Sequence, residues 1–310
     1  MLILLWGLSS ERTMAAVIEP LHRLGAPTRL IDQLDVLHTA VRLDVDARVR
    51  GSVRIREQTI DLEAVSAVYL RPYDTRLPAT TSPGAGDAAW RHAVAVEDAL
   101  ASWSELTPAL VVNRLEAMAT NSSKSYQLRQ ISRFGFRVPE TLVTTDPRAA
   151  RDFWARHGTV VYKSVSGIRS RVSRLRPGDH ARLDDVAACP TQFQEFVAGR
   201  DHRVHVVATD VFASVVECDA DDYRYAGGRP VDIRACVLPR EVEDRCRTLA
   251  EALDLPVAGI DLRQGRDGEW YCFEVNPSPA FAFYQDATRQ PIGEAVARFL
   301  AGHAARGGVG

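Results

Sequence analysis

Alternating runs of apolar and polar residues divide the chain into three predicted sections. The first section, residues 1–110, opens with a short apolar run typical of a buried strand, and a helix-spaced pattern follows and ends at Gly25. Predicted strands lie at 2–6 and 65–70, predicted helices at 13–24 and 88–100, and a predicted mobile loop at 80–87. We therefore expect this section to form a small α/β unit.

The second section, residues 111–191, mixes helical and extended patterns. Asp146 is a favourable helix N-cap, Pro147 suits the first helical position, and Gly158 ends that pattern. Predicted helices lie at 122–134 and 147–157, and predicted strands at 137–143 and 159–163.

The third section, residues 192–310, is rich in strand patterns. Asp210 lies in a tight turn between two of them, which predicts an antiparallel hairpin. Predicted strands lie at 192–197, 203–208, 211–217, 257–263 and 270–277, and predicted helices at 241–253 and 292–301. The chain as a whole is predicted to be α/β of the mixed, α+β kind.

Composition narrows the classes of function. Of 310 residues, 46% are hydrophobic and 25% are charged, as in ordinary globular proteins. The formal charge of −2 provides no broad basic field, so no nucleic-acid partner is predicted. The five cysteines show no C-x-x-C spacing, which argues against a zinc site and fits a reducing cytosol. The first apolar run is too short for a signal peptide or a membrane span, and we expect a cytoplasmic protein.

Two strand patterns near the end of the chain carry acidic residues. In the strand at 270–277, Glu274 and Asn276 share one face by the alternation of strand side chains, whereas Phe273 and Val275 are expected on the other. If this strand pairs with the one at 257–263 as a hairpin, Asp261 lies near Glu274. Three oxygen donors then converge, as magnesium prefers. A solvated polar sheet face is the alternative.

Two lysines and one strand edge are candidates for binding a nucleotide. Lys163 ends an apolar strand, and Lys124 opens a helix whose N-terminus favours anions. The strand at 192–197 offers backbone groups to an adenine, with Gln194 near the adenine amino group. Each of these features is also compatible with an ordinary solvated surface.

Polar residues after that edge extend the candidate site. Asp201 is placed to bind ribose hydroxyls, and Arg203 projects from a polar sheet face where it suits phosphate charge. Arg224 follows an acidic run, so a local surface ion pair is its alternative role.

In their order along the chain, these motifs resemble the ATP-grasp ligases. The resemblance covers about residues 113–300, and residues 1–110 are only loosely similar to the variable domain that precedes that fold. The motifs that carry it are 121–128, 138–143, 160–163, 194–197 with 201–203, and 259–262 with 273–277. Within the superfamily, the chain resembles the ligases that add glutamate to a ribosomal protein and the graspetide synthetases, which join side chains within a ribosomal peptide.

The resemblance implies a fold and a set of roles. The fold would have two α+β subdomains that enclose ATP, at 111–191 and 192–310. Residues implied to bind ATP are Lys124 and Lys163 at the phosphates, Gln194, Glu195 and Val197 at the adenine, and Asp201 at the ribose. Implied metal ligands are Asp261, Glu274 and Asn276, which would hold Mg²⁺ as two ions, or Mn²⁺. Arg203 and Arg224 would stabilise the transferring phosphoryl group.

The implied reaction is attack of a substrate carboxylate on the γ-phosphate of ATP, after which an amine or hydroxyl displaces phosphate from the acyl phosphate. A peptide or protein, such as a ribosomal peptide, is the first candidate substrate, and a small amino-acid-like acid is the second. A nucleotide-binding protein without turnover and a phosphotransferase are the alternatives. An oligomer is compatible with the resemblance.

Two stretches depart from the pattern of the family. The loop at 164–171 has one glycine where many ATP-grasp enzymes have several, so Arg169, Arg171 and Arg174 are candidates for contacting phosphates or an acidic substrate there. The segment at 277–284 is apolar, unlike the polar ending typical of graspetide enzymes, which leaves the acceptor and the choice of amide or ester product open.

Overall fold

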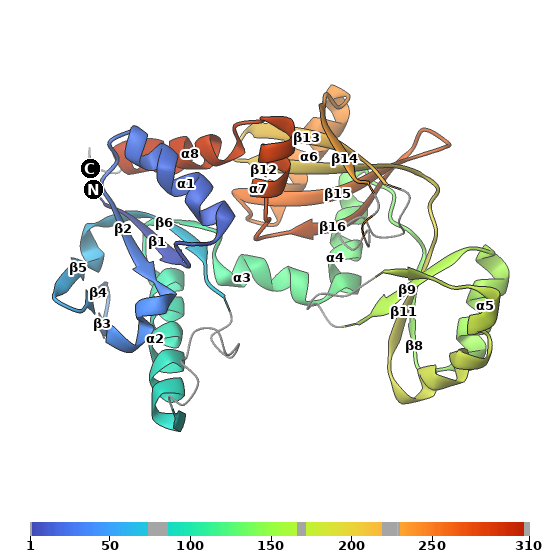
Figure 1. Ribbon diagram of the computed structural model, residues 1–310, viewed down its shortest axis with the longest axis horizontal. Helices are drawn as coiled ribbons and strands as arrows, with labels where there is room; N and C mark the ends of the chain where they lie inside the picture. The colour runs from blue at the N-terminus through green and yellow to red at the C-terminus, as the bar shows by residue number, and fades with distance from the viewer. Residues whose placement is uncertain (1, 74–85, 166–171, 219–227, 229, 307–310) are drawn as a thin grey trace.

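The computed structural model describes residues 2–73, 86–165, 172–218, 228 and 230–306. Its strands form four sheets, and the largest of them lies between the N-terminal sheet and the smaller antiparallel sheet that carries β8, β9 and β11 (Figure 1). In the part of the chain that the structure describes, no helix combines the length and the apolar character needed to cross a membrane.

The N-terminal sheet is parallel, with strand order β2-β1-β6-β7. Its strands are β1 (Leu2–Gly7), β2 (Thr28–Asp32), β6 (Val65–Arg71) and β7 (Leu110–Val112). Alternate β1 residues reach opposite faces: Ile3 and Leu5 pack against α1 (Arg12–Arg23), and Leu4 and Trp6 against α2 (Gly86–Leu106). The continuous apolar runs in the sequence thus reflect a sheet buried on both sides.

A small antiparallel sheet, β3-β4-β5, follows β2 and was not predicted. It consists of β3 (Thr39–Val45), β4 (Val49–Ile55) and β5 (Gln58–Asp61). Arg42, Asp44 and Arg54 are exposed on one face of this sheet, whereas Val41 and Val53 pair on the other face, as in a half-buried strand pattern. Only a few residues, such as Val53 and Ile60, are buried in the core.

The second antiparallel sheet has the order β10-β9-β11-β8. Its strands are β8 (Thr141–Thr144), β9 (Val160–Ser164), β10 (Ser173–Arg174) and β11 (Thr191–Glu195). The helix α5 (Pro147–His157) and the 3₁₀ turn Ala181–Ala188 cover one face, with Phe153 and Phe193 in the shared core. Asp146 caps α5 by accepting a hydrogen bond from the Arg148 N–H at 2.8 Å, as its position predicted.

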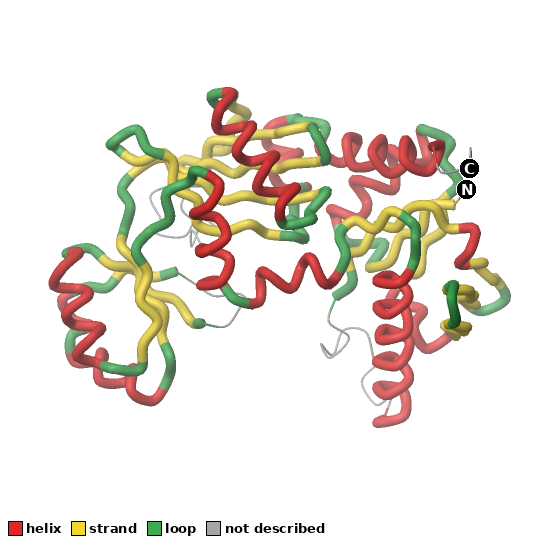
Figure 2. Tube along the Cα trace, turned by 180° about the vertical axis from the view of Figure 1, so that it is seen from behind, coloured by secondary structure: helices red, strands yellow, loops and turns green. Residues whose placement is uncertain are grey.

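The five-stranded antiparallel sheet has the order β14-β13-β12-β15-β16. Its strands are β14 (Asp232–Cys236), β13 (Asp210–Glu217), β12 (Gly199–Val207), β15 (Val257–Gly265) and β16 (Trp270–Asn276). The helices α4 (Lys124–Ile131) and α6 (Arg240–Ala252) bury one face, and Figure 2 shows both against the strands from behind. Short helices α3 (Leu115–Met118) and α7 (Ala282–Thr288) flank the sheet.

Packing crosses two of the predicted section boundaries. The final helix, α8 (Ile292–Arg306), packs beside α1 on the N-terminal sheet, and Ile292 and Val296 share a core with Ile3 (Figure 1). Likewise α4, from the predicted second section, packs on β16 of the third.

Two predicted elements differ from the structure. The predicted helix at 122–134 is α-helical only over α4, with a 3₁₀ turn at Ala119–Ser122 before it and another at Ser132–Phe134 after it. Gly135 ends it in the left-handed region with φ 78°, as expected. The predicted strand at 137–143 is wrong over its first half, because Arg137 pairs instead with β16 through hydrogen bonds to Trp270 and Cys272. This segment crosses from one antiparallel sheet to the other.

Arg71, at the end of β6, ties the N-terminal unit to the segment that follows β16. Its Nε donates to Glu11 Oε2 at 3.0 Å, and its Nη1 donates to the Pro279 carbonyl at 3.0 Å. Glu11 also caps α1 by accepting from the Met14 N–H at 2.7 Å. Burial by itself raises the pKa of the Glu11 carboxyl, but the Arg71 guanidinium and backbone N–H groups of α1 outweigh burial, so the pKa lies below its usual range.

We expect Glu11→Gln to lower stability by about 1–3 kcal/mol, because it removes the partner charge of a mostly buried guanidinium. Since the folded carboxyl has the lower pKa, this contribution is present above the unfolded value of about 4.3 and is lost as pH falls through the folded value. Urea unfolding midpoints of wild type and variant should therefore converge as the pH is lowered through the folded pKa of Glu11.

Glu19→Gln is the matched control, since Glu19 is exposed and pairs with Arg23 only at 3.9 Å. Equal losses in the two variants, or a difference that persists in acid, would contradict the role of the Arg71–Glu11 pair.

Candidate active site

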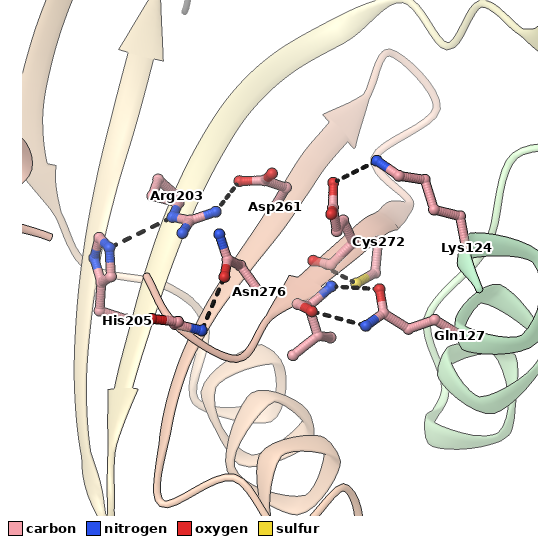
Figure 3. A network of polar contacts seen from close by, with 10 residues as sticks. Lys124, Gln127, Arg203, His205, Asp261, Cys272 and Asn276 are labelled. Atoms are coloured by element: carbon pink, nitrogen blue, oxygen red, sulfur yellow. Dashed lines mark hydrogen bonds and ion pairs between the residues drawn. The ribbon is translucent and has the colours of Figure 1, made fainter. Parts of the chain in front are cut away.

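Charged side chains from three neighbouring strands meet on one face of the five-stranded sheet (Figure 3). The register pairs Arg203 of β12 with Asp261 of β15, and Asp261 with Glu274 of β16. Asn276 lies beside them, opposite Gly259. The predicted hairpin of acidic strands is thus present, and the predicted proximity of Asp261 and Glu274 follows from it.

One part of the face assignment was wrong, because β16 contains a β-bulge. The register passes from Asp261–Glu274 to Leu262–Cys272, which leaves Phe273 as the extra residue. Cys272 and Val275 are both buried in the same core, although strict alternation predicted opposite faces for them. Phe273 lies instead under the guanidinium of Arg263, whose carbon is 5.3 Å from the ring centre, on the same face as Asp261.

Each carboxylate of the acidic pair faces a basic side chain. Arg203 Nη1 donates to Asp261 Oδ1 at 2.6 Å, and Lys124 Nζ lies 3.5 Å from Glu274 Oε2. The side chains of Arg203 and Lys124 are only 7% and 12% exposed, so these pairs are screened less by water than surface pairs. A Cβ at Gly259 would collide with the Arg203 guanidinium and with the Pro279 ring, so a side chain there would displace Arg203 from its present position.

Gln127, which the sequence analysis missed, positions Lys124. Its Nε2 donates to the Val275 carbonyl at 2.7 Å, and its Oε1 accepts from the Val275 N–H at 2.9 Å, so α4 is bonded directly to β16 (Figure 3). Lys124 precedes Gln127 by one helical turn and therefore stands beside Glu274. A polar residue next to the apolar Leu128 and Ile131 was the available signal.

Asn113 makes a similar connection at the other end of the acidic strands. Its Nδ2 donates to the carbonyls of Val257 and Pro277, and its Oδ1 accepts from the Val257 N–H. Asn113 thereby joins Val257, at the start of β15, to Pro277, the residue that follows Asn276 at the end of β16.

The three predicted metal ligands provide only oxygen donors, which suits a hard cation such as Mg²⁺. Asn276 Oδ1 accepts from the Ser278 N–H at 2.9 Å, and an amide oxygen has a second lone pair. Within the described ranges, no group of three or more His, Cys, Asp or Glu is placed to hold a metal. A metal here would therefore depend on Asn276 and on oxygens from outside the protein, as in phosphate-bridged magnesium sites.

The predicted adenine edge lies on β11, across from Lys163 of β9. Lys163 pairs in register with Gln192, and Gln194 lies two residues further along the same face. Gln194 is buried and donates to Thr141 Oγ1 at 2.9 Å. Glu195 points to the other side, where its Oε1 accepts from the Glu140 N–H at 2.9 Å, and its own N–H donates to the Glu140 carbonyl at 3.0 Å.

Asp201 is paired with Arg263 of β15, a residue that the sequence analysis did not single out. Arg263 donates to both Asp201 oxygens, at 2.6 and 2.9 Å, and its Nη1 donates to the Val197 carbonyl at 2.7 Å. Arg263 thus joins the 194–197 edge to the five-stranded sheet. Asp201 and Arg203 are two residues apart on β12, or about 7 Å.

Four other arginines were predicted to lie in or near the site. Arg224, Arg169 and Arg171 lie outside the described residues. Arg174, on β10, stacks its guanidinium 4.1 Å from the centre of the Phe196 ring, where β11 leads toward β12.

We expect Gln127→Leu to lower stability by about 2–4 kcal/mol, because the N–H and C=O of Val275 would both lose their partner in a buried setting. Thermal unfolding measures the loss. Gln130→Leu, on the same helix and partly exposed, is the control and should stay within about 0.5 kcal/mol of wild type. If Gln127→Leu were as stable as the control, the connection between α4 and β16 would not depend on Gln127.

No protein-family model matches the chain. It is 27% identical over 206 residues to beta-citrylglutamate synthase B of Danio rerio, and the match covers 61% of the chain and 50% of that protein. It is 25% identical to a probable alpha-L-glutamate ligase of Syntrophotalea carbinolica, with 62% and 67% covered. The chain thus matches about half the length of the first relative.

Solved structures match nearly the whole chain. ATP-grasp ligase PsnB, in complex with a phosphomimetic variant of its minimal precursor, Mg and ADP, has a TM-score of 0.83 and 26% identity, and the match covers 97% of this chain and 98% of that one. The macrocyclase MdnC from Microcystis aeruginosa, bound with its precursor peptide MdnA, has a TM-score of 0.80 at 22% identity, covering 97% and 100%. These likenesses confirm the fold expected from the sequence.

Proposed function

We propose that this chain, which has the fold of the ATP-grasp ligases, activates a carboxylate with ATP and joins it to an amine or hydroxyl nucleophile, releasing ADP and phosphate. The observation that carries the proposal is the cluster of Asp261, Glu274 and Asn276 with Arg203 and Lys124 on one sheet face. Acidic and amide oxygens suit a metal, and the two cations beside them suit phosphates.

The nucleotide is proposed to lie along β12 and β15, from the adenine edge to this cluster. Backbone groups of Glu195 and Val197, with Gln194, would meet the adenine, and Asp201 the ribose. Lys124 and Lys163 would hold phosphates. Asp261, Glu274 and Asn276 would hold Mg²⁺, which would neutralise charge on the phosphate oxygens.

Arg203 is proposed to stabilise the charge of the transferring phosphoryl group. It is held against Asp261 before the reaction, so its orientation costs no reorganisation. Phosphoryl transfer of this kind requires positioning and charge neutralisation rather than a covalent nucleophile of the protein. Arg224 lies outside the described residues, and we keep as a proposal its predicted role of stabilising the transferring phosphoryl group together with Arg203.

A peptide or protein is the proposed source of the carboxylate. PsnB and MdnC, whose structures cover almost the whole chain, are complexed with precursor peptides. A second candidate is a small amino-acid-like acid, which the glutamate ligase and citrylglutamate synthase relatives favour. Purified protein with Mg-ATP can be offered peptides that combine Glu or Asp with Lys, Ser or Thr, and separately glutamate with citrate. Release of AMP and pyrophosphate would contradict the acyl-phosphate route.

Glu274→Gln and Asp261→Asn should each lower ATP turnover by roughly 100-fold or more, because each removes a charge from the cluster that organises the phosphates. Turnover is measured as ADP formed with whichever acid supports the wild type. Glu269→Gln is the control, since Glu269 lies in the exposed turn before the same strand. Full activity of a correctly folded Glu274→Gln variant would show that the metal assignment is wrong.

Lysine modification provides a test that needs no acid or nucleophile substrate. Lys124 and Lys163 are the only two lysines in the sequence, so an amine-selective acetylating reagent reports on both proposed phosphate contacts at once. We expect Mg-ATP to slow acetylation of both side chains, measured for each by peptide mass spectrometry, and Mg²⁺ alone to leave the rates unchanged. Protection of one lysine without the other would remove the unprotected one from the phosphate site.

A further inference from the structure

His205 lies on β12, two residues beyond Arg203, on the same face of the sheet (Figure 3). Its side chain is fully buried, and its ring centre is 5.0 Å from that of Tyr284 and 6.4 Å from that of Phe281. Both aromatic residues belong to the apolar segment that follows β16, where the sequence departs from the graspetide pattern. His205 therefore contacts both this segment and Arg203.

Arg203 is held on several sides. Its Nε donates to His205 Nε2 at 3.4 Å, and its Nη1 donates to Asp261 Oδ1 at 2.6 Å. Its guanidinium carbon also lies 5.7 Å from the centre of the Tyr284 ring. A planar guanidinium with contacts at Nε and at Nη1 has its plane defined, and a point charge such as lysine would not be oriented in this way.

The protonation state of His205 agrees with an acceptor role. Burial, and then the neighbouring Arg203 guanidinium, hold the pKa of His205 well below its usual range, so the ring is neutral near pH 7. Because Nε2 accepts from Arg203, the single ring proton belongs to Nδ1. A charged ring would repel the guanidinium and would have no lone pair at Nε2.

We propose that His205 is a positioning residue, which accepts a hydrogen bond from Arg203 and so orients its guanidinium toward the transferring phosphoryl group. The proposal rests on the function proposed above for Arg203. It gives the apolar segment a role in the reaction, because Tyr284 and Phe281 keep His205 dry and in place. A purely structural histidine in an aromatic core would contribute stability alone.

Two variants with amide side chains distinguish a positioning role of His205 from a purely structural one. In His205→Gln the amide can occupy the position of Nε2 and accept from Arg203, whereas in His205→Asn it reaches only the position of Nδ1. The probe is MgADP with and without aluminium fluoride, a mimic of the transferring phosphoryl group, and calorimetry measures both dissociation constants. No acid substrate is needed.

We expect aluminium fluoride to tighten MgADP binding to the wild type and to His205→Gln. In His205→Asn this gain should fall by about 10-fold or more, while the affinity for MgADP alone stays within about twofold. Equal gains in the two variants would overturn the proposal. If His205→Asn does not fold, His205→Leu replaces it, because leucine fits an aromatic pocket and accepts no hydrogen bond.

A double-variant cycle tests whether His205 acts through Arg203. In an Arg203→Lys background, which lacks the Nε donor, adding His205→Asn should change the fluoride-dependent gain by less than about twofold. An undiminished effect would show that His205 acts by another route. If the wild type binds no MgADP, the proposed function itself is wrong. If aluminium fluoride tightens MgADP binding equally in the wild type and in His205→Asn, only the role inferred for His205 is contradicted.

Discussion

The site depends on the pairing of Arg203 with Asp261 across two strands of one sheet. Placing several charges in a largely buried setting is costly unless each charge has a partner, and here the cations and the carboxylates provide partners for each other. The same arrangement suits phosphates and a metal, because phosphate oxygens carry charge complementary to the cations, and a metal carries charge complementary to the carboxylates. Gly259 has to lack a side chain for the guanidinium to fit.

Helices and loops from distant parts of the chain hold this face in place. Gln127 bonds α4 to β16, and Asn113 joins the start of β15 to the residue after β16. Arg263 connects the adenine edge to the sheet through Asp201 and Val197. Arg71 brings the N-terminal sheet to Pro279, close to the end of the acidic strand. The N-terminal unit therefore forms a core of its own and also helps to hold the site in place.

Much of the fold was predictable because its elements have strong local patterns. Buried strands such as β1 and β6, and the capped helix α5, follow from apolar periodicity and end signals. The ATP-grasp fold, inferred from ordered motifs, is confirmed by solved structures that cover nearly the whole chain. The β3-β4-β5 sheet was missed although its strands alternate apolar and charged residues. The strand at 137–143 was overestimated because Arg137 pairs with a strand over 130 residues away.

The sequence alone determined which residue types the site contains, since the acidic hairpin, the lysines and the arginine all lie in recognisable local patterns. Only the tertiary structure decided how they combine. The bulge at Phe273 reversed part of the face assignment, and the contacts of Gln127 with Val275 and of Arg263 with Asp201 join residues that no local period relates. Local patterns report the conformation of a segment, whereas pairing of buried polar groups depends on which strands and helices meet.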